Sequence, residues 1–481
     1  MSSPPATAPG NSVPLCVDLD GTLLKTDLLW ESLVRLLKRN PLYLLVVPLW
    51  WVRGRAFLKR QIAARVELDT AALPCNKSFV IFLRDEKRQG RPLFLATASD
   101  RELATQVAEN IGLFDDVLAS DGKMNLRAGN KARTLTERFG KRGFDYAGNS
   151  SPDLEVWAAA REAIVVNAGT GLTEQAARRT KLGRVFDPSR SRLPALIQCL
   201  RPHHWIKNLI IFVPLLTSHQ IGNWPLLFDA LWAFVAFSLC ASGVYVLNDL
   251  LDLDADRHHP EKKNRPFASG DLPLPVGLAI FPILFIASAL VSSGLPWAFT
   301  GILAVYFVVT TSYSWRLKQV PILDVFVLAG LYSIRLVAGQ LATGIVLSDW
   351  LLVFSMFIFL SLALAKRFLE LQTLRQENKT DARGRGYAAG DREIVATLGL
   401  VCGCVAVLVL ALYVNSPQVI ILYRRPTLLL LVCLLFLYWV SRVWFVAHRG
   451  RMREDPVVFA LLDWVSYVVG ALMLVVIWLA T

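Results

Sequence analysis

Long apolar runs dominate the chain from about residue 205 to its end, and no other feature of the sequence limits the possible folds as strongly. Nine such runs alternate with short polar loops, and most are close to the roughly 20 residues that a helix needs to cross a bilayer. Across the whole chain 54% of the residues are hydrophobic, which is unusual for a soluble protein. The sequence therefore predicts an all-α bundle of nine transmembrane helices over residues 205–481. The runs lie at about 206–218, 226–247, 274–293, 296–312, 321–341, 350–365, 394–414, 427–446 and 457–480.

Basic residues in the loops between these runs predict how the chain crosses the membrane. If the N-terminal part is cytoplasmic, the loops on that side hold nearly all of the lysines and arginines, and the opposite loops hold only Arg424 and Arg425. Lys and Arg are retained on the cytoplasmic side of membrane proteins. We therefore expect a multi-pass protein of the inner (cytoplasmic) membrane whose N-terminal domain is cytoplasmic.

The net charge of +13 has the same explanation. In a soluble protein it would suggest nucleic acid, but topology accounts for most of it here, and anionic lipid headgroups and an anionic substrate account for the rest. The seven cysteines show no CxxC or zinc-type spacing, so a disulfide framework is not expected. The partners expected from charge are the bilayer and an anionic substrate, without nucleic acid. The sequence indicates no oligomeric state.

Residues 13–185 show a different pattern, in which apolar strands alternate with helices. This alternation predicts an α/β domain with a parallel sheet. Residues 1–12 lack the basic and apolar regions of a signal peptide, so we expect a disordered leader. Residues 186–204 are basic and contain prolines, which predicts a linker. The expected strands lie at residues 14–17, 92–96 and 164–166, and a helix at about 154–163 precedes the last strand.

An insertion of about residues 27–69 separates the first two strands. Its apolar centre, residues 42–52, contains two tryptophans and is too short to span a bilayer. Arg53 and Arg55 follow directly. A segment with tryptophans and basic residues suits the membrane interface, and it suits equally a cap subdomain that packs on the α/β core. Both interpretations stay open at this point.

The second apolar run ends in an acidic segment that begins at Asn248. On a continuous helix, Asn248, Asp252 and Asp256 would share one face, with Asp249 at its border. Carboxylates stacked on one face repel each other unless cations lie among them, and oxygen ligands favour Mg²⁺. The cations that follow suit the remaining charge of a diphosphate. They are Lys262, Lys263 and Arg265.

This acidic segment and the Lys262–Pro266 run after it resemble the first motif of the UbiA superfamily of intramembrane prenyltransferases. The resemblance covers about residues 200–481, and nine spans match that fold. It implies that the acidic residues and the asparagine bridge Mg²⁺ to a diphosphate. It also implies a catalytic role for Asp249, Asp252 and Asp256, with Asn248 as a neutral ligand.

Four further segments look most like the polyprenyl-phosphate phosphoribosyltransferase branch of this superfamily. In that branch the diphosphate belongs to phosphoribosyl pyrophosphate, and the lipid phosphate is the nucleophile. Aromatic prenyltransferases usually carry a second aspartate pair where this chain has Asp324 and Leu328. Asp324 could also be a satisfied residue at a helix end. The similar segments are residues 201–208, 264–270, 365–367 and 455–463, and the expected substrate contacts are Tyr313, Lys318, Asp324, Lys366 and Arg367.

Arg335 lies well inside the fifth apolar run. A charge at that depth is costly and is a candidate for function. Pairing with Asp324 is not expected, because eleven residues of helix separate the two by about 16 Å.

Four short motifs in the N-terminal domain resemble, in order, those of the haloacid dehalogenase-like (HAD) phosphotransferases. The resemblance implies that Asp18 is the nucleophile and that Asp20 is the general acid and base. Thr97 and Lys131 match the second and third motifs as substrate contacts. Asp18, Asp20, Asn149 and Asp153 are the implied Mg²⁺ ligands. Asn149 stands where an aspartate is usual, so the metal should be held less well.

Three functions are compatible with the sequence. The favoured one is Mg²⁺-dependent transfer of phosphoribose from phosphoribosyl pyrophosphate to a polyprenyl phosphate, with the HAD-like domain removing the 5-phosphate. The second is transfer of a polyprenyl group from its diphosphate to an aromatic acceptor, with a non-catalytic HAD-like domain. The missing second aspartate pair counts against it. The third is a membrane transporter or anchor, which the lack of an internal repeat disfavours.

Overall fold

The structure is a computed structural model that describes residues 13–121, 124–186, 192–376, 386–416, 419, 423–452 and 455–480. The leader expected at residues 1–12 lies outside these ranges. The chain forms two compact units. The first is Met1–Leu200 with Val246–Ile280, and the second is Arg201–Tyr245 with Phe281–Thr481. The acidic segment therefore belongs to the same unit as the N-terminal domain.

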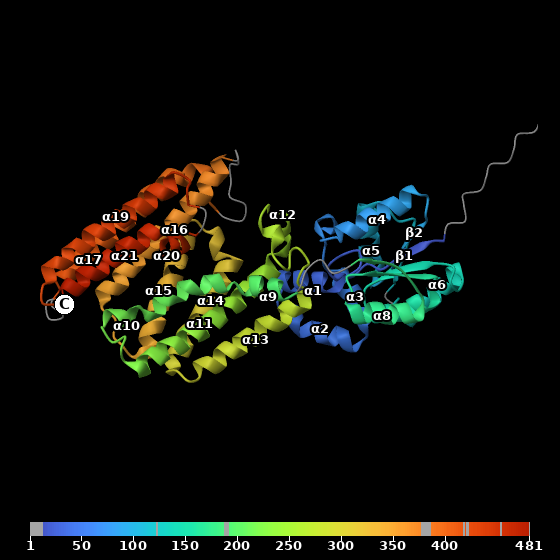
Figure 1. Cartoon of the computed structure of the whole chain (residues 1–481), viewed down its shortest axis with the longest axis horizontal. Helices are drawn as coiled ribbons and strands as arrows, with labels where there is room; N and C mark the ends of the chain where they lie inside the picture. The colour runs from blue at the N-terminus through green and yellow to red at the C-terminus, as the bar shows by residue number, and fades with distance from the viewer. Residues whose placement is uncertain are drawn as a thin grey trace, which may run out of the picture. The chain divides into compact units, whose positions relative to one another are not determined.

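A six-stranded, wholly parallel sheet forms the centre of the first unit (Figure 1). Its strand order is β3-β2-β1-β4-β5-β6, which confirms the predicted parallel α/β architecture. The predicted strand at 92–96 is longer in the structure and continues to Asp100. The strands are β1 (Leu15–Val17), β2 (Leu93–Asp100), β3 (Asp116–Ser120), β4 (Asp145–Gly148), β5 (Glu162–Val166) and β6 (Lys181–Phe186).

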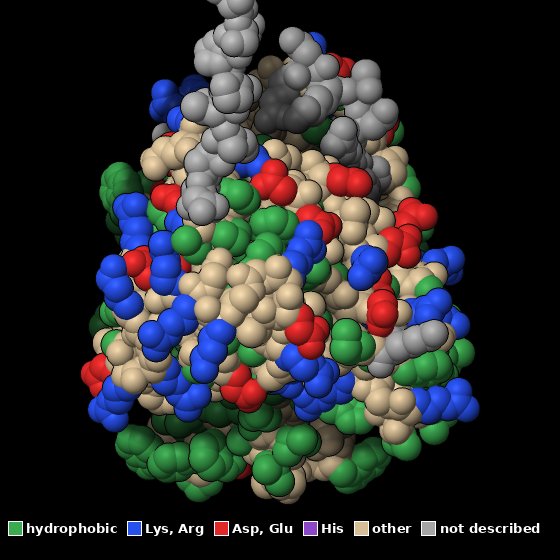
Figure 2. Space-filling model, turned by 90° about the vertical axis from the view of Figure 1, so that its right-hand side faces the viewer, with side chains coloured by type: hydrophobic (Ala, Val, Ile, Leu, Met, Phe, Trp, Pro, Cys, Tyr) green, Lys and Arg blue, Asp and Glu red, His purple; other side chains and the backbone are tan. Residues whose placement is uncertain are grey.

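Hydrophobic clusters cover both faces of this sheet. Leu15 and Val17 of β1 belong to one cluster, and Cys16 between them belongs to the other, because successive side chains of a strand point to opposite faces. Helices complete the two layers. They are α4 (Lys77–Arg88), α5 (Arg101–Ile111), α6 (Gly129–Phe139), α7 (Asp153–Ala159) and α8 (Thr170–Arg179). The expected linker contains a further helix, α9 (Arg192–Leu200). Lys and Arg side chains outnumber Asp and Glu on the face of this unit that Figure 2 shows.

The insertion after β1 folds into three helices, α1 (Leu28–Arg39), α2 (Tyr43–Val52) and α3 (Arg55–Ala63). Asp27 caps α1 by accepting a hydrogen bond from the Leu29 amide. A small apolar cluster of α1 and α3 residues, with Leu36 at its centre, joins the three helices. Helix α2 has no buried residue.

The acidic segment is not the continuous helix that its spacing predicts. Helix α11 (Trp224–Leu251) ends before Asp252, and α12 (Leu253–His258) begins after it. Asp252 has the dihedral angles φ −97° and ψ 13°, outside the α-helical region. The backbone amides of Asp252 and Asp256 still bond to the carbonyls of Asn248 and Asp252, at 2.9 and 2.8 Å. The break therefore interrupts the helix at Asp252 while these two hydrogen bonds of helical spacing are retained. The short helix η3 (Lys262–Asn264) follows.

Seven helices in the described part of the chain are long and apolar enough to cross a membrane, so the predicted membrane region is confirmed but the count of nine is not. The run at 206–218 forms the short helices η2 (Pro202–Phe212) and α10 (Val213–Thr217). The last run divides at Asp463 into α20 (Pro456–Leu462) and the 17-residue α21 (Trp464–Ala480), because the Asp463 carboxylate accepts the Ser466 amide at 3.0 Å. The seven are α11, α13 (Leu274–Ser292), α14 (Trp297–Trp315), α15 (Leu323–Thr343), α16 (Asp349–Gln376), Ala389–Val414 with α17 (Arg392–Val414), and Pro426–His448 with α19 (Leu429–His448).

Candidate functional site

A cavity of about 600 Å³ lies in the first unit at the carboxyl ends of β1 and β4. In this strand order the winding of the chain reverses between these two strands, so their connections leave toward opposite faces and a crevice remains. Five of the predicted residues line the cavity: Asp18, Asp20, Lys131, Asn149 and Asp153. The structure therefore brings together side chains that are spread over more than 130 positions of sequence.

Asp18 follows β1 directly and is buried. Its Oδ1 accepts a hydrogen bond from the Lys131 ammonium at 2.7 Å, and this ammonium also donates to the Tyr146 hydroxyl at 2.8 Å. The Tyr146 hydroxyl donates to Asp153 at 2.8 Å. Burial raises the pKa of Asp18 to about 7, although the charge of Lys131 opposes the shift. Tyr146 is a member of this network that the sequence did not reveal, because nothing local distinguishes it from a core aromatic residue of β4.

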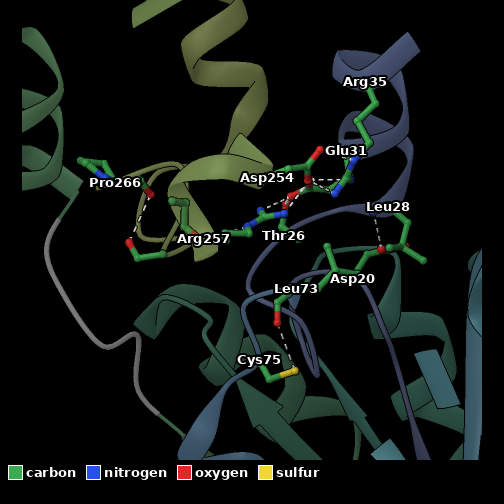
Figure 3. Close-up of polar contacts among 12 residues, drawn as sticks. Asp20, Thr26, Leu28, Glu31, Arg35, Leu73, Cys75, Asp254, Arg257 and Pro266 are labelled. Atoms are coloured by element: carbon green, nitrogen blue, oxygen red, sulfur yellow. Dashed lines mark hydrogen bonds and ion pairs between the residues drawn. The ribbon is translucent and has the colours of Figure 1, made fainter. Parts of the chain in front are cut away.

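Asp20 lies in the loop between β1 and α1, just before the insertion. Its carboxylate accepts a hydrogen bond from the Leu28 amide at 2.9 Å (Figure 3). It also accepts a hydrogen bond from the Ser99 hydroxyl. Burial, with a contribution from the neighbouring Asp27, raises the pKa of Asp20 to about 6. A carboxyl group with such a pKa can both donate and accept a proton near neutral pH.

The last motif places an unpaired oxygen in the same cavity. Asp153 accepts hydrogen bonds from the Asn149 and Ser150 amides at 3.0 and 2.9 Å, so it fixes this loop. The Asn149 Oδ1 atom is buried and has no hydrogen-bond partner among the described residues. Within those residues, no three His, Cys, Asp or Glu side chains are grouped as a metal site. Two carboxylates, Asp18 and Asp20, and one orphaned amide oxygen nevertheless form an oxygen-only donor set that fits Mg²⁺.

Thr97 was expected to contact the substrate, but it does not lie at the cavity. Because β2 continues to Asp100, Thr97 is inside the strand instead of closing it. Its side chain is buried and accepts the Ser99 amide at 3.0 Å. The only link of Thr97 to Asp20 in the described structure is through Ser99, whose hydroxyl donates to the Asp20 carboxylate.

The acidic segment forms a second cluster in the first unit. The Arg265 guanidinium donates to Asp249 at 3.0 Å and to Asp256 at 2.8 Å, and both carboxylates are buried. Burial raises the pKa of Asp256, although Arg265 opposes the shift. The Asn248 Oδ1 atom is buried and has no partner within the described residues. Lys262 and Lys263 are exposed on η3. Arg265, predicted to contact a diphosphate, thus lies between the carboxylates that are predicted to hold Mg²⁺.

A network that the sequence did not predict joins this segment to the insertion (Figure 3). Glu31 of α1 is fully buried and accepts hydrogen bonds from Arg257 of α12 at 2.6 and 3.1 Å and from the Thr26 hydroxyl at 2.7 Å. Arg35, one turn further along α1, bonds to Asp254. One local feature of the sequence could have indicated that Glu31 is buried: it lies three residues after the apolar Leu28, on the same face of the helix. Its partner lies 226 positions away.

Two of the predicted substrate contacts of the second unit, Lys366 and Arg367, are engaged with carboxylates. Arg367 pairs with Asp324 and donates to the Tyr313 hydroxyl at 2.8 Å. The Tyr387 hydroxyl donates to Asp324 at 2.6 Å, so Asp324 is a satisfied residue in the first turn of α15. Lys366 and Lys207 both contact Asp455, at 2.7 and 3.2 Å. Two ammonium groups thus share one carboxylate and leave a net positive charge. Lys318 lies in η4 (Leu317–Gln319).

Arg335 is buried without an ion pair in the described part of the chain. Its guanidinium donates to Asn208 at 2.8 Å and also contacts the Leu331 carbonyl. The rings of Phe237, Tyr306 and Tyr332 surround it with centroid distances of 5.1 to 5.4 Å. These hydrogen bonds and cation–π contacts offset the cost of the buried charge. As expected, Arg335 does not pair with Asp324.

A parallel α/β sheet, a set of membrane-length helices and an acidic cluster after the first of these helices define the class of this protein. The model of the UbiA prenyltransferase family matches residues 209–467. The chain belongs to the UbiA prenyltransferase family.

Three relatives show how far the similarity extends. An uncharacterized protein, y4nM, of Sinorhizobium fredii is 35% identical over 96% of this chain and 90% of its own length. The nodulation protein NoeC of Azorhizobium caulinodans is 37% identical over 58% of this chain and 91% of its own length. A decaprenyl-phosphate phosphoribosyltransferase of Mycolicibacterium smegmatis is 35% identical over 38% of this chain and 59% of its own length. Similarity to the S. fredii protein thus includes the N-terminal domain.

Proposed function

We propose that this chain transfers phosphoribose from phosphoribosyl pyrophosphate to a polyprenyl phosphate, in a reaction that needs Mg²⁺. The observation that carries the proposal is the acidic cluster, in which the buried Asp249 and Asp256 face Arg265 next to the orphaned Asn248 oxygen. Such a set of oxygen ligands beside a cation suits a metal-bound diphosphate. The partial similarity to a decaprenyl-phosphate phosphoribosyltransferase supports a sugar diphosphate as the donor.

The proposed transfer depends on positioning of the two substrates and on stabilisation of charge more than on proton transfer. An oxygen of the lipid phosphate forms a bond to the anomeric carbon while the bond to the diphosphate breaks, and the electron pair leaves with the diphosphate. Mg²⁺ held by Asn248, Asp249, Asp252 and Asp256 would supply charge stabilisation to that leaving group. Lys262 and Lys263, exposed on η3, would bind its outer oxygens.

Two groups in the second unit are proposed to bind the phosphates that do not react. Lys366 shares Asp455 with Lys207, so this pair has one positive charge in excess and suits a phosphate monoester. Lys318 is proposed to assist from η4. Arg367 is occupied by Asp324, and we assign it the role of positioning the Tyr313 hydroxyl.

We propose further that the first unit removes the 5-phosphate of the lipid-linked product. Asp18 would attack phosphorus, while the bond to the ribose oxygen breaks and that oxygen takes a proton from Asp20. Water would then attack the aspartyl phosphate, give its proton to Asp20 and release phosphate. The contact of Asp18 with Lys131 and the pKa of Asp20 near 6 support these roles.

The test uses the purified full-length protein in lipid vesicles with Mg²⁺. Labelled phosphoribosyl pyrophosphate with a polyprenyl phosphate should give a labelled lipid, and the Asp249→Asn variant should not. The Asp18→Asn variant should make the lipid but retain its 5-phosphate. If label enters lipid only from a polyprenyl diphosphate with an aromatic acid, the donor is an isoprenoid and the proposal is wrong.

A further inference from the structure

Helix α2 exposes an apolar surface that the described chain leaves uncovered. Its ten residues contain no charged side chain, and none of them is buried. Leu44, Leu45 and Leu49 are 66%, 74% and 65% exposed. A helix that is apolar all round is normally enclosed by protein or by a membrane, and a contiguous exposed apolar patch marks an interaction site.

Basic residues directly after α2 indicate what covers it. Arg53 and Arg55 are exposed, and their guanidinium groups lie over the rings of Phe57 and Trp51 at 5.6 and 5.3 Å. An apolar helix with aromatic residues and arginines at one end is complementary to an anionic bilayer surface, because the rings and the cations occupy the headgroup region. A bilayer is available to this chain, whose described part contains seven helices of membrane length.

The cavity of the first unit extends from the carboxylates to this helix. One wall contains Trp51 of α2 and Trp30 of α1, and another contains Leu274 and Pro275 in the first turn of α13. Helix α13 is itself one of the membrane-length helices. The cavity therefore reaches from Asp18 to residues at which a membrane span begins, and apolar side chains form part of its lining there.

The turn before α13 forms part of the cavity wall. Lys25 and Asp271, which both line it, form an ion pair at 3.1 Å. A Cβ atom on Gly270 would lie 2.6 Å from Lys25 Cβ, so the two segments are in close contact. The wall on the α13 side is thus fixed to the loop that follows Asp18 and Asp20.

We propose that α2 lies in the membrane surface and that this cavity takes a phosphate monoester carried on a membrane lipid, in preference to a soluble one. This inference rests on the proposed phosphatase activity of Asp18. The phosphate binds at Asp18 and Lys131, and the apolar wall of Trp30, Trp51 and Leu274 accepts the beginning of the lipid chain. Hydrolysis follows the steps given above, with water as the second reactant.

The test compares two probes that share one phosphate group. Octadecyl ribofuranoside 5-phosphate is placed in vesicles of phosphatidylcholine and phosphatidylglycerol that contain the full-length protein, and methyl ribofuranoside 5-phosphate is added in solution. Wild-type protein should release phosphate from the octadecyl probe with a kcat/KM at least about tenfold higher. A Leu45→Glu/Leu49→Glu variant should lose about tenfold on this probe, because glutamates remove the apolar side chains from the bilayer.

Controls separate the possible outcomes. Ile81→Glu changes an exposed apolar residue of α4, 58% exposed, and should affect neither probe. The α2 variant should cleave the methyl probe like wild type, which shows that it is folded. Equal kcat/KM for both probes, or equal loss on both in the α2 variant, overturns the inference but leaves the phosphatase in place. No phosphate from either probe overturns the phosphatase proposal and the inference together.

Discussion

Glu31 of the N-terminal domain links this domain to the acidic segment through its ion pair with Arg257. It is fully buried and faces the guanidinium groups of Arg257 and Arg35, and the Arg257 side chain is only 3% exposed. A buried pair is not in itself evidence of stability, but removal of one partner leaves a buried charge without compensation. The position of Glu31 is therefore more sensitive to substitution than the number of its contacts suggests.

We predict that Glu31→Gln lowers the free energy of unfolding by about 3–5 kcal/mol, as expected for breaking a buried ion pair. Denaturant unfolding of the detergent-solubilised protein measures the change. Lys181→Ala breaks the exposed pair with Glu162, in which Lys181 is 74% exposed, and serves as the control. It should cost less than about 1 kcal/mol. Similar losses in the two variants would contradict a structural role for the Glu31 network.

The carboxyl groups of the cavity predict a dependence of stability on pH. The pKa values of Asp18 and Asp20 are raised to about 7 and about 6 by burial, whereas unfolded carboxyls lose their protons near pH 4. Between these limits the folded state binds more protons than the unfolded state. The free energy of unfolding should therefore fall as the pH rises from about 4 to about 7.

Unfolding midpoints at pH 5 and pH 8 in the presence of a chelator measure this dependence. Asp20→Asn should flatten it, and Asp85→Asn on the exposed face of α4 should not. Mg²⁺ added at pH 8 should restore stability, because a cation among the carboxylates replaces the protons. A wild-type protein that becomes steadily more stable across this pH range would show that these groups are not protonated in the folded state.

At the scale of elements, the turn before α13 leaves little freedom for its backbone. Gly270 has a φ of +75°, and a Cβ there would meet Lys25 Cβ at 2.6 Å. Gly90 has a φ of +79° and open space around it. A side chain at either glycine would strain the left-handed backbone. Only at Gly270 would the added Cβ also collide with a neighbouring segment.

We predict that Gly90→Ala costs about 1–2 kcal/mol from the left-handed backbone alone. Gly270→Ala should cost more by about 1–3 kcal/mol, because overpacking adds to the same strain. Unfolding of both variants measures the difference. Equal costs would mean that the Lys25 segment moves aside freely and that the wall of the cavity is not fixed.

Local sequence patterns were sufficient to predict those strands and helices whose formation depends on nearby residues. The strands around residues 15–17 and 164–166 and most of the apolar helices were found because hydrophobic periodicity decides them. The division at Asp463 was missed, since the continuing apolar run concealed a capping aspartate that accepts the Ser466 amide. The break at Asp252 was missed because the spacing of the acidic residues is that of a regular helix.

The same limit applies to the sites. Motif spacing identified Asp18, Lys131 and Asp249, but it could not show that Arg367 is engaged with Asp324 or that Arg257 reaches Glu31. Those pairs are separated by 43 and 226 positions, and only the packed structure brings them together. Resemblance to known motifs thus predicted roles for single residues, and the structure shows their partners.

At the scale of the whole molecule, the first compact unit is built from two segments that are separated in the sequence. Residues Val246–Ile280, which carry the acidic segment, pack with the N-terminal domain. Ion pairs hold them there, including those of Glu31, Arg35 and Lys25 with Arg257, Asp254 and Asp271. We therefore predict that a chain beginning at Arg201 is impaired in the transferase reaction, although it retains every residue of the acidic cluster.

The loss should be at least about tenfold, because small displacements of groups that position a substrate are costly. Label from phosphoribosyl pyrophosphate entering lipid measures the reaction in matched vesicles. Asp18→Asn in the full chain is the control: it disables the proposed phosphatase, keeps the packing, and should transfer label within about twofold of wild type. A truncated chain that equals this control would show that the acidic segment folds without its N-terminal partners. A truncated chain that recovers when residues 1–200 are added separately would show instead that packing, and not covalent connection, maintains the transferase site.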